Sequence, residues 1–114
     1  MVQDAAPASQ LVLGDLVINL SNYGVSVNDK EVGLTYYEFE LIRRLGEEPD
    51  KIIDYDTLCE AVWSSTGRNE KRRLTVAICR IRAKLSGLSL YHLDTVRGRG
   101  YGLLRRRDGK TAYG

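Results

Sequence analysis

One apolar stripe in the second half of the chain most constrains how it can fold. Four apolar residues fall within roughly 60° of one another on a helical wheel: Leu74, Ile78, Ile81 and Leu85. The spacing predicts an amphipathic helix from about Asn69 to Leu85 that buries this stripe. A chain of 114 residues, 43% of them hydrophobic, is long enough for one such core and too short for two domains.

The opposite side of this predicted helix is basic. No acid occurs from Lys71 to Lys84, and arginines alternate there with small side chains, with Lys84 at the margin: Arg72, Arg73, Val76, Cys79, Arg80 and Ala83. Small side chains allow close approach to a surface, arginines bind phosphates or guanine edges, and a valine methyl fits against a thymine methyl. The pattern favours a helix that binds nucleic acid over a basic face that only promotes solubility.

Charge is also segregated along the whole chain. Residues 1–67 contain 4 basic and 12 acidic residues, and residues 68–107 contain 12 basic and 2 acidic residues. The formal net charge of +2 therefore conceals an acidic half joined to a basic half. Such asymmetry indicates nucleic acid or an anionic surface as a partner.

The remaining composition excludes several classes of protein. Cys59, Cys79 and His92 match neither a disulfide framework nor a zinc pattern. The first ten residues lack the features of a signal peptide, and no apolar run is long enough to span a membrane. One histidine and scattered acids offer no catalytic arrangement. We therefore predict a cytoplasmic protein that is not an enzyme and holds no metal or cofactor.

The first third of the chain has the alternating pattern of strands. Residues 1–10 read as a linker or a disordered N-terminus, and residues 11–34 predict three or four short antiparallel strands. Leu16, Ile18 and Leu20 alternate with other residues, as do Tyr23, Val25 and Val27. Turns are expected at Ser21-Asn22 and Asn28-Asp29.

Two further helices are expected in the middle of the chain. Thr35 and Glu38 form a capping box, and Gly46 and Pro49 end the helix that follows. Ile52-Ile53 predicts a short strand. Asp54 or Asp56 then caps a second helix, whose apolar face is made by four residues: Leu58, Cys59, Val62 and Trp63.

The C-terminal part predicts a hairpin with a basic tip. Residues 91–96 and 101–104 read as strands around Arg97-Gly98-Arg99-Gly100, where the glycines allow a tight turn and the arginines supply charge. The G-x-G in this segment does not open a helix, so the dinucleotide-binding interpretation fails. The helix pair and the hairpin together suggest a helix-turn-helix with a wing. Residues 108–114 read as a flexible tail.

The chain resembles the winged helix-turn-helix effector domain of OmpR/PhoB-type response regulators over about residues 11–105. The resemblance is carried by five motifs in order: Gly14-Asp15-Leu16, Leu34-Thr35-x-x-Glu38-Phe39-Glu40-Leu41-Ile42, Leu58-x-x-x-Val62-Trp63, Val76-x-Ile78-x-Arg80-Ile81-Arg82-x-Lys84-Leu85 and Thr95-Val96-Arg97-Gly98-x-Gly100-Tyr101. It implies an α+β domain over residues 11–107, with a four-stranded antiparallel N-terminal sheet, three helices and a C-terminal β-hairpin.

The resemblance also implies partners and residue roles. Double-stranded DNA is the expected ligand, bound as direct repeats by head-to-tail pairs, with the third helix as recognition helix. The implied DNA contacts are Trp63, Arg72, Arg73, Val76, Ala77, Arg80, Arg82, Lys84, Thr95, Arg97 and Arg99. In some members a loop before the recognition helix contacts RNA polymerase, and here it comprises Ser64, Ser65, Thr66, Gly67, Arg68 and Asn69.

Two departures from the family pattern leave alternatives open. Ala77 and Cys79 stand where polar or basic residues are common, so the operator cannot be transferred from relatives. Ten residues cannot hold a receiver domain, which leaves either an effector domain separated from its receiver or a stand-alone regulator. The alternative function is a protein-interaction adaptor that uses acids expected to face away from DNA: Glu38, Glu40, Glu47, Glu48 and Asp50.

Overall fold

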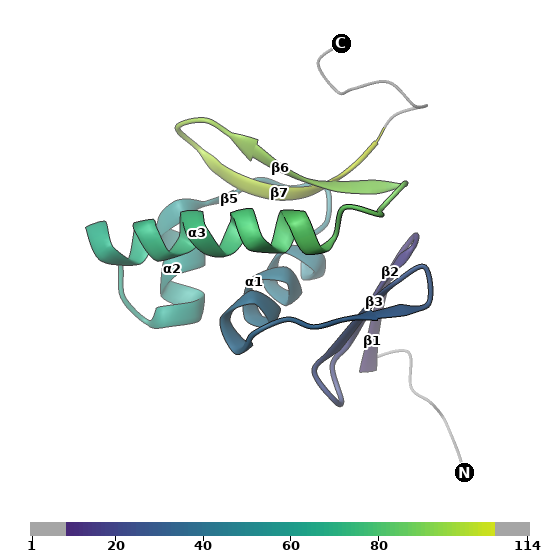
Figure 1. Ribbon diagram of the computed structural model, residues 1–114. Coiled ribbons are helices and arrows are strands. Elements are labelled where there is room, and N and C mark those ends of the chain that lie inside the picture. The colour runs from purple at the N-terminus through teal and green to yellow at the C-terminus, as the bar shows by residue number, and fades with distance from the viewer. Residues whose placement is uncertain (1–8, 107–114) are drawn as a thin grey trace.

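Residues 9–106 are described by a computed structural model and form two antiparallel sheets and three helices (Figure 1). The expectations for residues 1–8, for Arg107 and for the predicted tail at 108–114 lie outside the described residues. The first sheet contains four strands in sequence order: β1 (Gln10–Leu13), β2 (Leu16–Asn19), β3 (Gly24–Val27) and β4 (Lys30–Val32). The prediction of three or four short strands is therefore confirmed.

The alternation of apolar and polar side chains along the strands fixes the register of this first sheet. Leu16 pairs with Val27 and Ile18 with Val25, and all four side chains are buried on one face. Asn28 and Asp29 occupy the left-handed region expected of a two-residue hairpin turn. β1 begins at Gln10, and the carbonyl of Ser9 accepts a hydrogen bond from the Leu20 N–H. The predicted linker boundary at residue 10 therefore lies too far along the chain.

Helix α1 (Tyr36–Glu47) begins as predicted. The Thr35 hydroxyl accepts from the Glu38 N–H at 3.3 Å, and the Glu38 carboxylate accepts from the Thr35 N–H at 2.9 Å. The prediction that Gly46 ends the helix is wrong, because Gly46 lies inside α1. A Cβ at Gly46 would meet Ile18 Cδ1 at 2.8 Å. This glycine therefore allows the helix to pack closely on the first sheet.

Helix α2 (Tyr55–Trp63) follows the short strand β5 (Ile53–Asp54), and Asp54 is its cap. Helix α3 (Arg68–Lys84) begins and ends one residue before the predicted bounds. All four residues of the predicted apolar stripe are buried: Leu74, Ile78, Ile81 and Leu85. The helical period of the sequence therefore identified the inner face of α3 correctly.

The second sheet has the order β5-β7-β6 and includes the predicted hairpin, β6 (Tyr91–Val96) and β7 (Gly100–Arg105). Gly98 has φ +79° and makes the turn at the tip. Gly100 does not turn the chain. Its ideal Cβ would stand 2.0 Å from the Ile53 carbonyl oxygen, so glycine there allows β7 to approach β5. In Figure 1 the hairpin runs beside α3.

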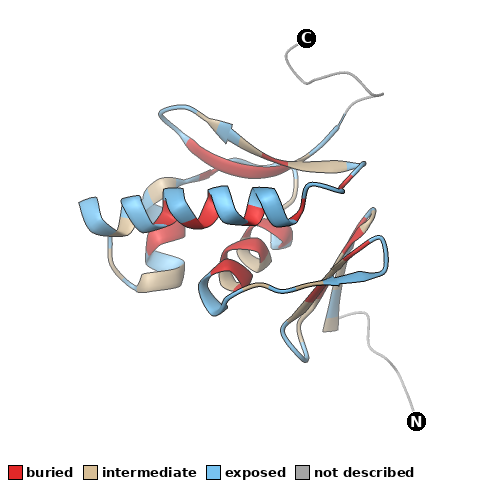
Figure 2. Cartoon of the chain, viewed as in Figure 1, coloured by how far each residue is buried: buried red, intermediate tan, exposed pale blue. Residues whose placement is uncertain are grey.

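The core lies where α1 meets the first sheet, the other two helices and the hairpin. Figure 2 shows buried residues on the inner sides of α1, α3 and β7, whereas the outer side of α3 is exposed. Leu41, Leu58 and Leu103 are fully buried within this one cluster. The predicted α+β architecture, with four strands, three helices and a C-terminal hairpin, is confirmed. One face of α3 and the tip of the hairpin remain uncovered.

Candidate nucleic-acid interface

The outer face of α3 presents the side chains that the sequence predicted. Arg72, Arg73 and Arg80 are exposed, and Val76 is 43% exposed between them. Within residues 9–106, the guanidinium groups of Arg72 and Arg73 make no hydrogen bond or ion pair. These positive charges are therefore available to an external anion.

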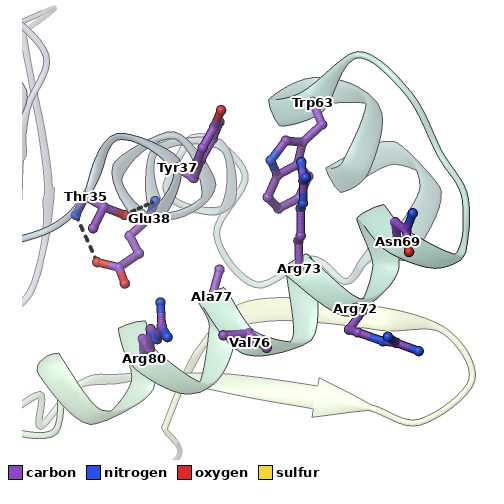
Figure 3. A pocket seen from close by; sticks show the side chains of 10 residues that line it. All are labelled: Thr35, Tyr37, Glu38, Trp63, Asn69, Arg72, Arg73, Val76, Ala77 and Arg80. Carbon is purple, nitrogen blue, oxygen red and sulfur yellow. Dashed lines mark hydrogen bonds between the residues drawn. The ribbon is translucent and has the colours of Figure 1, made fainter.

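An open groove of about 630 Å³ runs along one side of this face, between α3, the start of α1 and the end of α2 (Figure 3). In Figure 3, Arg73 and Arg80 extend from α3 toward the facing helices. The lining residues come from three elements and the residues that flank them: Thr35, Tyr37, Glu38, Trp63, Asn69, Arg72, Arg73, Val76, Ala77 and Arg80. The groove thus joins the basic face of α3 to the start of α1.

Ala77 differs from the other α3 residues predicted to contact DNA. Its side chain is only 8% exposed, because the helical turn places it beside Leu74 and Ile78 on the inner face. It lines the floor of the groove. A contact between Ala77 and DNA would therefore have to be made through the groove.

Tyr37, which the sequence did not single out, forms the other wall of the groove together with Trp63, and Tyr36 packs behind Tyr37. The rings of Tyr37 and Trp63 lie 5.5 Å apart, and those of Tyr36 and Tyr37 lie 5.2 Å apart. Trp63 is half-buried against the core, and its buried Nε1 has no hydrogen-bond partner among the described residues. The feature of the sequence that could have predicted this wall is the position of Tyr36 and Tyr37 directly after the Thr35 cap.

Glu38 connects the start of α1 to the end of α3. It is 2% exposed, and its Oε1 accepts a hydrogen bond from Lys84 Nζ at 2.7 Å. Burial alone would raise the pKa of Glu38, but the Lys84 and Thr35 hydrogen bonds and the Lys84 and Arg80 charges outweigh it and lower the pKa. The expectation that Glu38 faces away from the face predicted to bind DNA is wrong, because its side chain reaches Lys84 of α3 and lines the groove beside that helix.

The exposed polar residues of the wing differ in whether they have partners within the fold. Arg97 and Arg99 are exposed and make no side-chain hydrogen bond or ion pair within the described part of the chain. Arg82 instead donates from Nε to the Leu93 carbonyl at 3.1 Å and from Nη2 to Thr95 Oγ1 at 2.7 Å. Two predicted DNA contacts, Arg82 and Thr95, therefore bind each other.

The loop predicted to contact polymerase is shorter than expected. Ser64 ends α2 in the left-handed region, and the Ser65 hydroxyl donates to the Glu70 carboxylate at 3.0 Å. Arg68 and Asn69 belong to α3 and not to the loop. Residues 64–67 alone connect the two helices.

The acids of the first half are largely used within the fold. Glu40 and Glu47 pair with Arg43 at 2.7 and 2.8 Å. Glu48 pairs with Arg44 at 3.5 Å, and Asp50 Oδ1 accepts from the Arg105 N–H. These carboxylates therefore already have intramolecular partners, which weakens the acidic half as support for an adaptor and leaves its other support, Ala77 and Cys79 on α3, unchanged.

The remaining predictions concern metal binding, membrane insertion, the two cysteines and the histidine. Among residues 9–106, no group of three or more acids, cysteines and histidines could hold a metal ion. Within the same range, no helix is long and apolar enough to cross a bilayer. Cys59 is buried, and burial raises the pKa of its thiol, whereas Cys79 is exposed on α3. His92 lies in β6 as expected.

The fold and this surface define a winged helix-turn-helix DNA-binding domain. The family model described as transcriptional regulatory protein, C terminal, matches residues 29–103. The chain belongs to this family, the OmpR/PhoB-type DNA-binding domains of response regulators. It is therefore a DNA-binding transcription-regulator domain and not an enzyme, as predicted.

Individual relatives agree with this assignment. The chain is 35% identical over 94 residues to the heme response regulator HssR of Staphylococcus epidermidis, which covers 82% of this chain and 42% of that protein. It is 31% identical, with the same coverage, to HssR of Staphylococcus aureus. The chain thus spans less than half the length of these curated relatives.

Two solved structures show the same fold. The DNA-binding domain of RstA from Klebsiella pneumoniae, solved in complex with the RstA box, aligns with a TM-score of 0.74 and 28% identity. The alignment covers 83% of this chain and 96% of that domain. The OmpR/PhoB homologue DrrB from Thermotoga maritima gives a TM-score of 0.73 and 26% identity, over 84% of this chain and 44% of DrrB.

Proposed function

We propose that this domain binds double-stranded DNA with α3 in the major groove and the β6–β7 wing on the flanking backbone or minor groove. The observation that carries the proposal is the placement of free arginines on two neighbouring elements. Arg72 and Arg73 on α3 and Arg97 and Arg99 on the wing all lack intramolecular partners within residues 9–106. One duplex could neutralise both groups together.

The residue roles follow from exposure and chemistry. Arg72, Arg73 and Arg80 would bind phosphates or guanine edges, and the exposed methyls of Val76 would contact a thymine methyl. Arg97 and Arg99 would hold the flank, and the backbone near Trp63 would hold a phosphate at the groove. In this proposal one duplex would contact both the groove beside α3 and the tip of the wing.

The proposal also covers how the domain assembles on DNA, which partner it contacts and where it acts. We expect direct repeats bound by head-to-tail pairs, with half-sites about one helical turn apart. Ser64, Ser65, Thr66 and Gly67 form the exposed connection that would contact RNA polymerase, next to Arg68 and Asn69 at the start of α3. The domain would act in the cytoplasm as the effector part of a two-component response regulator.

The salt dependence of DNA binding tests the central proposal. If about 6 phosphates are neutralised, log K should fall against log[salt] with a slope near −5. Selection from a random duplex pool should then yield one motif with a regular repeat spacing. An adaptor would instead show no salt-sensitive retention on duplex DNA and no enriched motif, and that result would overturn the proposal.

A further inference from the structure

The wing has little support from its own sheet. β6 and β7 form a two-stranded hairpin, and the third strand of the sheet, β5, contributes only Ile53 and Asp54. A two-stranded hairpin alone is marginally stable in water. The tip at residues 97–99 is exposed on all sides. Contacts from outside the hairpin must therefore fix the position of the tip relative to α3.

Tyr55 supplies one such contact at the base of the tip. Its hydroxyl accepts a hydrogen bond from the Gly98 N–H at 3.2 Å and lies 3.4 Å from the Val96 carbonyl, to which it donates. Its ring packs edge-on against Tyr101 of β7, with 5.4 Å between the ring centroids. Tyr55 is the first residue of α2, held by the Asp54 cap. One side chain thus joins the helix-turn-helix to the turn of the wing.

Arg82 supplies a second contact from the opposite side. Its guanidinium donates to the Leu93 carbonyl and to the Thr95 hydroxyl, both on β6. The planar guanidinium group holds both bonds in one geometry, which a lysine cannot reproduce. β6 is therefore tied to α3 at residues 93 and 95, and its last residue, Val96, and Gly98 in the turn that follows are tied to α2.

We infer that Tyr55 and Arg82 are positioning residues that fix the wing against the helix-turn-helix before DNA binds. A wing that is already in place loses less conformational freedom on binding, so its contacts contribute more to affinity. Arg80 and Arg97 then meet the duplex as parts of one rigid surface. This inference rests on the proposed contact between the wing and DNA.

Tyr55→Phe removes only the hydroxyl oxygen and so tests the contact of Tyr55 with the turn of the wing. The Gly98 amide should exchange its hydrogen faster, while amides in the middle of α3 keep their rates. The variant loses both hydrogen bonds of the hydroxyl, and affinity for the selected duplex should fall about fivefold. Tyr91→Phe is the matched control, because the Tyr91 hydroxyl of the same hairpin makes no hydrogen bond within residues 9–106.

A double-mutant cycle separates positioning from general destabilisation. In an Arg97→Ala, Arg99→Ala background, where the wing tip has lost its charges, Tyr55→Phe should cause no further loss of affinity. An equal loss in both backgrounds, or an unchanged Gly98 exchange rate, overturns the inference. If the arginine changes alone leave binding unaltered, the proposed wing contact fails, while Gly98 exchange still decides whether Tyr55 fixes the wing.

Arg82→Lys tests the second contact because it keeps the charge and removes the paired bonds. Faster exchange in β6 and weaker binding are expected if Arg82 positions the wing. Unchanged exchange with wild-type affinity would show that only its charge matters, which contradicts the inference for this residue.

Discussion

The acidic and basic halves of the chain differ in what their charged side chains contact. In the first half, Arg43 joins Glu40 and Glu47 in one network on α1, and Glu38 is buried against Lys84. In the second half, Arg72 and Arg97 reach no partner within the described residues. Several carboxylates of the first half are therefore paired inside the fold, whereas arginines on the outer face of α3 and at the tip of the wing remain available to a ligand.

The difference shows that a net charge says little about a binding surface. Ion pairs between residues three or four apart on one helix, such as those on α1, contribute only about a few tenths of a kcal/mol each to stability. Their larger effect is electrostatic, because a paired carboxylate and guanidinium offset each other's charge on the surface of α1. The basic face of α3 has no such cancellation, so it determines the electrostatic character of the molecule toward DNA.

The largest expected effect on binding follows Arg80→Ala. Losing a guanidinium that contacts a base should reduce affinity about 5- to 150-fold and relax sequence preference. Arg43→Ala is the matched control, because Arg43 is engaged with Glu40 and Glu47. Gel-shift titration on the selected duplex measures both. Equal losses of affinity for the two variants would show that unpaired arginines on α3 and paired arginines on α1 do not differ in DNA binding.

Glu38→Gln should give the largest effect on stability among the acids. The variant loses the charge in the bond from Lys84 Nζ to a buried carboxylate, and the free energy of unfolding should fall by about 2 kcal/mol. Glu31→Gln is the control, since Glu31 is exposed and has no side-chain partner in the part of the chain described. Urea unfolding compares them, and a loss shared by both variants would contradict a special role for Glu38.

The pH dependence of stability gives a second test of the contact between Glu38 and Lys84. The pKa of Glu38 is lowered in the fold from its ordinary value of 4.5. Its contribution to stability is therefore complete above about pH 4.5 and declines as the pH falls through the folded-state pKa. The stability gap between wild type and Glu38→Gln should shrink on acidification from pH 6 toward pH 3 in urea titrations. A gap that stays constant would refute this assignment.

The smallest effect is expected for Arg97→Ala. A lost phosphate contact should weaken binding a fewfold and evenly across DNA sequences, and should make the salt slope about 0.9 less steep. Binding isotherms at several salt concentrations, on the selected duplex and on an unrelated one, measure this. A loss confined to the selected duplex would instead assign Arg97 to base recognition.

Much of the fold was predictable because its signals are local. The Thr35 capping box, the turn at Asn28-Asp29 and the period of α3 each involve residues within a few positions of one another. The two glycine assignments failed for the opposite reason. Gly46 and Gly100 are needed where distant backbone or side chains approach closely, and nothing adjacent in sequence reveals such an approach.

The candidate site was predicted in part. Helical geometry identified the exposed arginines of α3, and the glycine-rich basic segment at residues 97–100 predicted the tip of the wing. Ala77 was transferred from the family pattern although the same geometry places it on the inner face. The groove and its aromatic wall were missed because Tyr37 and Trp63 come together only when α1 and α2 pack.

The sequence by itself determined the elements, the inner face of α3 and the segregation of charge, because periodicity, caps and composition act over short distances. Only the tertiary structure decided which charges remain free. Glu38 meets Lys84 across 46 residues, and the Tyr55 hydroxyl meets the Gly98 amide across 43. Such partners are brought together by packing of the whole core, so only the folded chain shows which arginines remain free to bind DNA.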